Sequence, residues 1–316
     1  MYDVVLLSLD EPAGGCGSAC SGCGQADSCD DRPRTPVLHA IDALHAAGAR
    51  AEAVTAHDDR EIDEVLTRLD GPPRADGLTW PASDTKTRLI VVTASDSQLR
   101  HVLRRMVRRY APPPSRRPAD LRAGRTVPDL PVVGVLPLDP RSTEDLAARL
   151  GLARDPASVA SVVLGDRTRR LDLLRHDGGA ITIDGTLLGA ADEHGQAVPW
   201  RGRVEVDDTV LSDGEEALLA CAVANAGGYV DFGGIPLIVD PNPADGLVEV
   251  AVAVAVTVSR PLRRPTTRLE VRRARGRAVS VTPRDGDLPY VEDGVTGTLT
   301  RKRSWWIEPA AWSVFE

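Results

Sequence analysis

Four cysteines lie close together near the start of the chain, where all four could reach one ion. Cys16, Cys20, Cys23 and Cys29 follow the spacing C-x3-C-x2-C-x5-C and are interspersed with glycines. Four thiolates on a glycine-rich loop can enclose one zinc ion or an iron-sulfur cluster, and the spacing does not separate the two. An unliganded or disulfide-bonded surface loop is the alternative. Because Cys221 is the only other cysteine of the chain, the grouping favours a ligand.

Three aspartates lie at the junctions of predicted elements, where a carboxylate can serve in binding or catalysis. Asp96 precedes a predicted helix, Asp145 falls in the first turn of another, and Asp293 begins an Asp-Gly pair. Each position also has an ordinary structural explanation. An aspartate before a helix is a common N-cap, an acid in a first turn is favoured by the helix dipole, and Asp-Gly is a common turn. The local pattern leaves both interpretations open.

The charge of the chain limits its partners. The 46 acidic and 38 basic residues give a formal charge of -8 and a pI near 5.4, which argues against a nucleic-acid binder. Nearly all basic residues are arginines, a usage typical of a GC-rich, bacterial coding bias. Residues 100–125 contain nine arginines. This segment is interpreted as a solvated helix face and loop, or as a peripheral contact for an anionic membrane surface.

The hydrophobic pattern of the first half predicts strands that alternate with helices. Strands are predicted at 4–9, 52–55, 88–93 and 131–136, and helices at 35–47, 58–69, 97–110, 143–150 and 157–164. Such alternation indicates a parallel sheet covered by helices. Residues 1–164 are therefore expected to form an α/β domain.

The second half changes to one strand after another, separated by turn signals such as Asp177-Gly178-Gly179. Strands are predicted at 169–175, 180–183, 203–206, 217–225, 247–258, 269–274 and 278–282. Segment 217–225 is equally compatible with a helix, because alanine, leucine and glutamate favour one. Residues 165–308 are expected to form a domain made mainly of antiparallel strands, a sandwich or barrel.

The hydropathy pattern predicts neither a membrane-spanning segment nor a secretory signal. The longest apolar run, 248–258, is too short to cross a bilayer and is interpreted as a strand. Residues 1–12 lack the basic start of a secretory signal. A cytoplasmic location is therefore expected.

The order of these motifs resembles the diacylglycerol kinase-like lipid kinases over nearly the whole chain. Segment 130–152, LPVVGVLPLDPRSTEDLAARLGL, is similar to the family's strand, glycine-rich turn and helix, with Asp145 in register. Segment 241–254, PNPADGLVEVAVAV, is similar to a family strand entry, and Asp293-Gly294 to the family's Asp-Gly-Glu motif. The resemblance implies an N-terminal Rossmann-like α/β nucleotide-binding domain, a C-terminal antiparallel β-sandwich, and a closing strand at 309–316 that returns to the first domain.

The departures from the family pattern concern the phosphate turns. Ala94-Ser95-Asp96-Ser97-Gln98 stands where the family has Gly-Gly-Asp-Gly-Thr, a turn whose glycines let backbone amides approach ATP phosphates. Residues 139–144 replace a second glycine-rich turn, and Val295 replaces the glutamate of Asp-Gly-Glu. By the resemblance, Asp293 is nominated as the catalytic base.

The same resemblance implies ATP and Mg²⁺ as cofactors. It nominates four residues for nucleotide binding: Ser95, Asp96, Ser97 and Asp145. Three functions remain open: an ATP-dependent kinase for a lipid or other small-molecule alcohol, a catalytically degenerate binding protein, or a protein that responds to metal or redox state through its cysteines. Because the cysteine loop follows the first predicted strand, we expect it to lie near the nucleotide site.

Overall fold

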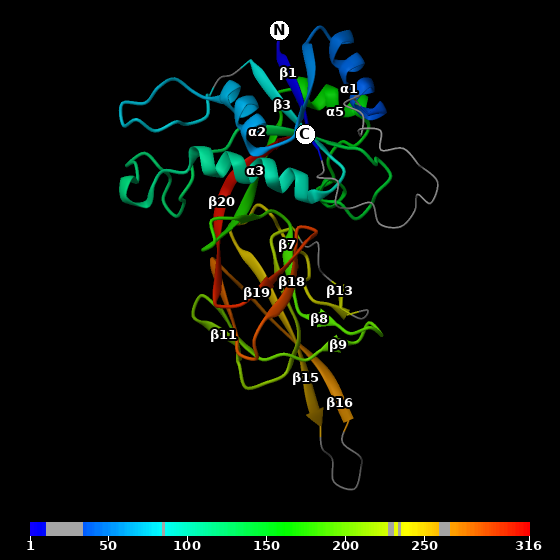
Figure 1. Cartoon of the computed structure of the whole chain (residues 1–316), viewed down its shortest axis with the longest axis vertical. Coiled ribbons are helices and arrows are strands. Elements are labelled where there is room, and N and C mark those ends of the chain that lie inside the picture. The colour runs from blue at the N-terminus through cyan, green and yellow to red at the C-terminus, as the bar shows by residue number, and fades with distance from the viewer. Residues whose placement is uncertain (11–33, 84–85, 227–230, 233–234, 259–265) are drawn as a thin grey trace.

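The computed structural model describes residues 1–10, 34–83, 86–226, 231–232, 235–258 and 266–316. Figure 1 shows helices gathered around strands at one end of the molecule and strands alone at the other. Within the described residues, no helix combines the length and apolar character needed to cross a bilayer.

The helical end is a parallel sheet covered on both faces. Its elements are β1 (Asp3–Leu9), α1 (Thr35–Ala46), β2 (Arg50–Ala56), α2 (Asp59–Leu66), the 3-10 helix η1 (Thr67–Leu69), β3 (Thr87–Thr93), α3 (Asp96–Tyr110), the 3-10 helix η2 (Pro114–Arg116), β4 (Val132–Pro137), α4 (Leu146–Arg149) and α5 (Pro156–Leu164). The strands are parallel in the order β4-β3-β1-β2. This confirms the predicted α/β architecture.

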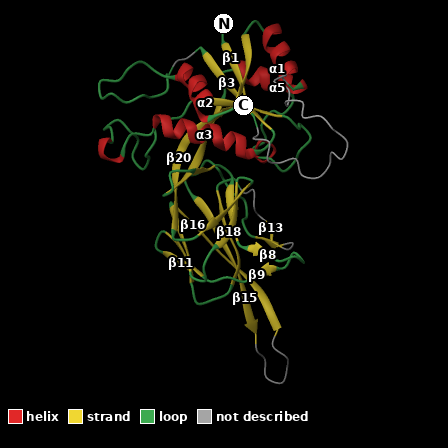
Figure 2. Ribbon diagram, in the orientation of Figure 1, coloured by secondary structure: helices red, strands yellow, loops and turns green. Residues whose placement is uncertain are grey.

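The helices divide between the two faces because neighbouring side chains of a strand point in opposite directions. Leu6 of β1 belongs to a core with residues of α1 and α5. Leu7 belongs to a core with residues of α2 and α3. Figure 2 shows the two pairs of helices flanking the strands.

The second end is made of antiparallel strands. They are β5 (Thr168–His176), β6 (Ile181–Thr182), β7 (Gly185–Leu188), β8 (Ala190–Ala191), β9 (Ala197–Val198), β10 (Gly202–Val206), β11 (Thr209–Asp213), β12 (Leu218–Ala224), β13 (Asp231–Phe232), β14 (Ile235–Pro236), β15 (Val248–Val258), β16 (Thr266–Gly276), β17 (Ala278–Pro283), β18 (Leu288–Glu292), β19 (Val295–Leu299) and β20 (Arg303–Phe315). One sheet has the order β16-β15-β12-β7-β18-β19. It packs on β10, β17 and β20 through a core that includes Leu188, Val252 and Trp305, which makes a sandwich.

The strand β20 joins the two domains. Its first part pairs with β17, and Ser313 and Val314 pair in parallel with β4. One sheet therefore runs through both domains in the order β11-β10-β17-β20-β4-β3-β1-β2. A bulge between Glu308 and Trp312 marks the passage, and Ala310 within it has a positive φ of 51°. The segment expected to close the first domain is the last part of this longer strand.

The ambiguous segment 217–225 is a strand, β12, in the middle of its sheet. Ala220 and Ala222 pack on one side with Leu237, whereas Cys221 and Val223 face the sandwich core on the other. Pairing with β7 and β15 along its length decides the conformation against the helical preference of its residues.

The helix predicted at 143–150 is shorter in the structure. It spans only Leu146–Arg149 as α4, because Asp145 stands outside it in extended conformation and accepts a hydrogen bond from Ala148 N at 2.8 Å. The prediction was wrong at this boundary, since an acid in a first turn and an N-cap acid produce the same local sequence signal.

Candidate functional site

The two predicted phosphate turns lie side by side at the carboxyl edge of the parallel sheet. β3 and β4 are paired in parallel, so the turns that follow them meet at one edge. The first leads into α3 at Asp96, and the second leads through Asp145 into α4. In open α/β sheets, ligands bind at this edge. The fold thus brings together the residues nominated for nucleotide binding.

The carboxylate of Asp96 bonds to the start of α4. Its two oxygens accept hydrogen bonds from Leu146 N at 2.9 and 3.1 Å, and one of them accepts from Arg149 at 3.0 Å. Burial raises the pKa of Asp96, although the Leu146 N–H and the Arg149 guanidinium favour the charged form. Asp96 therefore occupies a backbone donor that a phosphate at α4 would need.

Asp145 occupies another of these donors. Besides Ala148 N it accepts hydrogen bonds from Arg154, which also donates to Pro140 O at 3.0 Å and Asp139 O at 2.8 Å. Burial acts to raise the pKa of Asp145, but the hydrogen bonds from Arg154 and Ala148 N and the charge of Arg154 together outweigh it, and the pKa lies below its usual value. Arg154 therefore fixes the turn that replaces the second glycine-rich turn, through Asp139, Pro140 and Asp145.

The first phosphate turn is closed in a similar way. Ala94 N donates to Gln98 Oε1 at 2.7 Å, and the hydroxyl oxygens of Ser95 and Ser97 lie 2.7 Å apart. In a glycine turn these backbone and side-chain positions are open to a phosphate. Here Ala94 N is bonded to the side chain of Gln98, and the hydroxyl groups of Ser95 and Ser97 are bonded to each other.

Arg149 connects these turns to the second domain. Its guanidinium forms ion pairs with Asp96, at 3.0 Å, and with Asp184, which lies between β6 and β7. Asp184 is buried. The acids at the domain junction are therefore neutralised by arginine rather than left available for a cation.

Asp293 is fully buried in the turn between β18 and β19. Its carboxylate accepts hydrogen bonds from Ile183 N and Asp184 N at 2.9 Å and from Gly185 N at 3.1 Å. Burial raises the pKa of Asp293 to about 7, against the opposing effect of Arg100, whose Nε lies 3.4 Å from Oδ2. Its backbone has a positive φ of 48°. A raised pKa suits a base near neutral pH, and the three amide bonds suit a turn-capping residue.

Glu292 is a site residue that the sequence analysis missed. Its carboxylate accepts hydrogen bonds from Thr182 Oγ1 at 2.6 Å, Thr186 Oγ1 at 3.1 Å and Trp305 Nε1 at 3.2 Å. Arg100 Nη2 lies 2.5 Å away. Burial acts to raise the pKa of Glu292, but Arg100 and these donors lower it below its usual value. The only local signal was its place before the Asp-Gly pair.

A cavity of about 310 Å³ opens at this edge of the sheet. We call it the α3 cavity. It is lined by Leu9, Asp10, Ser97, Gln98, Arg100, His101, Arg104 and Val295. Three of these side chains are basic, so the cavity suits an anionic ligand. Ser97 and Val295 are thus found at one cavity although the chain separates them widely.

The cysteine site lies outside the described residues. Within the described part of the chain, no group of three or more histidine, cysteine or acidic side chains is arranged to hold a metal. Cys221 is a free, buried cysteine of β12, and burial raises the pKa of its thiol to about 12.

The arginine-rich segment 100–125 is partly paired within the protein. Arg105 pairs with Asp59 and Asp63, and Arg109 pairs with Asp70. These contacts attach α3 to α2 and the loop after it. Arg104 and Arg108 remain exposed on α3.

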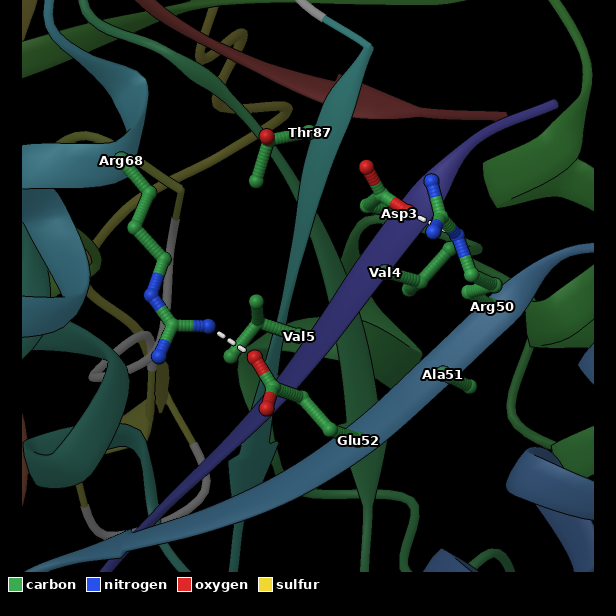
Figure 3. Close-up of a pocket in the computed structure, with 8 residues that line it drawn as sticks. All are labelled: Asp3, Val4, Val5, Arg50, Ala51, Glu52, Arg68 and Thr87. Atoms are coloured by element: carbon green, nitrogen blue, oxygen red, sulfur yellow. Dashed lines mark hydrogen bonds and ion pairs between the residues drawn. The ribbon is translucent and has the colours of Figure 1, made fainter.

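A separate cavity of about 400 Å³ lies on the edge of the parallel sheet. Figure 3 shows its lining from β1, β2 and β3, with the side chain of Arg68 reaching Glu52. Arg50 pairs with Asp3 at 2.8 Å. None of the nominated site residues lines this cavity, and its charged groups are already paired.

Comparison with known proteins shows similarity of fold at low sequence identity. No protein-family model and no curated protein matches the chain. The crystal structure of a diacylglycerol kinase from Bacillus anthracis str. Sterne is similar over 98% of this chain and 96% of that chain, with a TM-score of 0.58 and 12% identity. An NAD kinase from Archaeoglobus fulgidus in complex with ATP is similar over 100% of this chain and 94% of that chain, with a TM-score of 0.51 and 10% identity. The chain has a diacylglycerol kinase-like fold.

Proposed function

We propose that this protein binds a phosphate-bearing small molecule, with a nucleotide as the first candidate, in the α3 cavity and is degenerate as a phosphotransferase. One observation carries the proposal: three backbone donors at the two phosphate turns are bonded to side chains of the chain itself. Leu146 N and Ala148 N bond to aspartates, and Ala94 N bonds to Gln98.

Phosphoryl transfer depends on positioning the phosphates and neutralising their charge. A phosphate at the start of α4 would have to displace the carboxylates of Asp96 and Asp145 and leave Arg149 and Arg154 without them. A magnesium ion would compete with the same arginines for the same carboxylates. The nominated residues therefore fit ATP and Mg²⁺ poorly in the arrangement that a kinase needs.

The α3 cavity keeps the features of a binding site. Arg100 and Arg104 place two positive charges at its wall, against one carboxylate, that of Asp10. Arg104 is exposed, and its charge is one of those that lower the pKa of Asp59. An anionic ligand gains charge-assisted hydrogen bonds here without disturbing the phosphate turns.

Calorimetry with ATP, with and without Mg²⁺, tests the proposal, together with an assay for phosphate transfer to diacylglycerol. We expect ATP to bind, Arg104→Ala to weaken binding by about tenfold, or about 1.4 kcal/mol, and transfer to remain at background. Arg108→Ala is the matched control, since Arg108 is an exposed arginine of the same helix that does not line the cavity. Absence of binding, or turnover in the range of about 1–100 per second typical of kinases, would contradict it.

ATP-dependent phosphorylation of a lipid or other alcohol is the second candidate, favoured by the raised pKa of Asp293, about 7. In that case Asp293 would accept the proton of the hydroxyl group. Asp293→Asn should then reduce transfer by about a hundredfold to ten-thousandfold. A melting curve of the variant separates this loss from unfolding, and full activity in a folded Asp293→Asn protein would exclude the assignment.

A metal- or redox-responsive role of the cysteines is compatible with either candidate. Asp10, the last described residue before the cysteine segment, lines the α3 cavity. The cysteine segment follows Asp10 in the sequence, and its proximity to the nucleotide site remains part of the proposal. Cytoplasmic location and a membrane contact through the exposed arginines of α3 are part of the same proposal.

A further inference from the structure

A third cavity, of about 490 Å³, lies at the edge of the parallel sheet opposite to the α3 cavity. We call it the Trp80 cavity. It is bordered by Val132, the first residue of β4, and by the loops before β3 and after α3. The α3 cavity is bordered instead by Leu9 and Asp10, at the end of β1. Figure 1 shows both loops projecting on the same side of the first domain.

Two residues that line this cavity each hold a buried hydrogen-bond donor with no acceptor within the described part of the chain. The donors are Nε1 of Trp80 and Nε of Arg125. Arg125 is only 1% exposed, and its other guanidinium nitrogens bond to Asp129, Pro128 O and Ala310 O. A buried donor without an acceptor costs about 1–3 kcal/mol. A ligand whose acceptor oxygens reach these donors, after a small shift of the side chains that cover them, would recover this free energy.

The charge of the lining favours an anion. Three arginines, Arg122, Arg125 and Arg170, line the cavity with two aspartates. Asp129 is shared by Arg125 and Arg170. Asp120 pairs with Arg74, which does not line the cavity, at 3.1 Å. The arginines are therefore in excess over the carboxylates available to them.

The rest of the lining is apolar. Leu121, Val127 and Leu130 are buried side chains of the same wall. The indole of Trp80 has the guanidinium of Arg74 3.9 Å from its ring centroid. A ligand with a hydrophobic body in addition to its charged group would bury that body against this wall.

The two loops hold the cavity in its observed shape. Gly71 N donates to Trp80 O at 2.7 Å, and Ala82 N donates to Leu69 O at 2.9 Å, which closes the loop that carries the indole. The ion pair of Arg74 with Asp120 ties this loop to the one after α3. A binding site that is already ordered loses less entropy when a ligand binds.

We propose that the Trp80 cavity binds a small organic oxyanion, a carboxylate or a phosphate monoester on an apolar body, at a site separate from the α3 cavity. The oxyanion accepts hydrogen bonds from Trp80 and Arg125, and the apolar body contacts the wall around Leu130. A volume of about 490 Å³ lies within the range of small-molecule sites.

Titration of ¹⁵N-labelled full-length protein tests the proposal, because the chain has 5 tryptophans and thus few indole signals. Trp80→Phe assigns the signal of Trp80. We expect benzoate or phenyl phosphate to shift this signal and to slow its hydrogen exchange. The probe that binds with the higher affinity identifies the carboxylate or the phosphate ester as the ligand class. Inorganic phosphate and benzyl alcohol, each lacking one half of the ligand, should bind at least about tenfold more weakly.

Variants on the cavity wall complete the test. Trp80→Phe, which keeps an aromatic ring and removes the donor, and Arg122→Ala should each weaken binding of the stronger probe by about fivefold or more. Arg108→Ala should leave it unchanged, since Arg108 lines neither cavity. Equal binding of benzyl alcohol, loss of binding in Arg108→Ala, or no shift of the Trp80 signal at millimolar probe would overturn the proposal.

Discussion

Arg100 of α3 and Glu292 of β18 form an ion pair across the domain junction, with 2.5 Å between Nη2 and Oε2. The side chain of Arg100 is 15% exposed and that of Glu292 is 2% exposed. The helix that lines the α3 cavity is thereby tied to the strand that ends at Glu292, next to Asp293. Ligand binding at the cavity and the ionisation of the buried acids act on the same arginine.

Removing one partner of this pair should destabilise the fold. Glu292→Leu leaves Arg100 and the hydroxyls of Thr182 and Thr186 without their acceptor, so we expect a loss of about 3–5 kcal/mol in the free energy of unfolding, measured with urea. The control is the exposed pair of Arg60 and Glu64, with 85% and 63% exposed side chains. Glu64→Gln should change stability by less than about 0.5 kcal/mol. Equal effects of the two substitutions would contradict a structural role for Glu292.

Asp293 should make stability fall as the pH rises. Its pKa is raised from 3.8 to about 7 in the folded protein. Between these values the folded state holds a proton that the unfolded state has lost. The slope therefore approaches a loss of about 1.4 kcal/mol per pH unit. In Asp293→Asn this contribution disappears.

The comparison of the two proteins isolates Asp293 from its neighbours. Burial lowers the pKa of His176, and that of Glu292 is also lowered. Through these two groups the folded protein becomes less stable as the pH falls, and this effect is present in both the wild type and the variant. Urea unfolding at pH 5 and pH 7 should show a stability difference between the two proteins that depends on pH. A constant difference would mean that Asp293 stays ionised through this range.

Opening the first phosphate turn should strengthen nucleotide binding. Ser95→Gly with Ser97→Gly removes two Cβ atoms and the hydroxyl pair at 2.7 Å. We expect ATP affinity to rise by up to about fivefold, the equivalent of one hydrogen bond of about 1 kcal/mol. Glycine at Ser97, inside α3, should also cost about 1 kcal/mol of stability. Calorimetry measures the affinity, and unchanged or weaker binding would show that phosphates do not approach this turn.

The cysteine loop should hold one zinc ion or one iron-sulfur cluster per chain. Anaerobically purified protein that absorbs visible light and bleaches with dithionite contains the cluster, whereas colourless protein with stoichiometric zinc contains the ion. Cys20→Ser with Cys23→Ser should remove either centre. Cys221→Ala is the control, because Cys221 is buried in β12. Four freely titratable loop thiols, with neither metal nor sulfide, would exclude the centre.

Local patterns in the chain were sufficient for its architecture. The alternation of strand and helix up to residue 164, and of strand and turn afterwards, reports which side chains are buried, and burial follows a period set by each backbone conformation. The two acids were predicted near helix starts, but their roles were wrong: Asp96 is the first residue of α3, after the N-cap Ser95, and Asp145 caps α4 instead of lying in its first turn. Segment 217–225 was undecided because its alanines suit either conformation until β7 and β15 pair with it.

Only the tertiary structure decided what the acids and arginines bind. The partner of Arg100 is 192 residues away along the chain, and the partner of Arg149 in the second domain is 35 residues away. No local period encodes such pairs, since they depend on which turns the sheet brings to one edge. The same holds for Trp80 and Arg125, which line one cavity because two loops pack together. Burial then raises or lowers each pKa, so the chemistry of these residues is a property of the assembled fold.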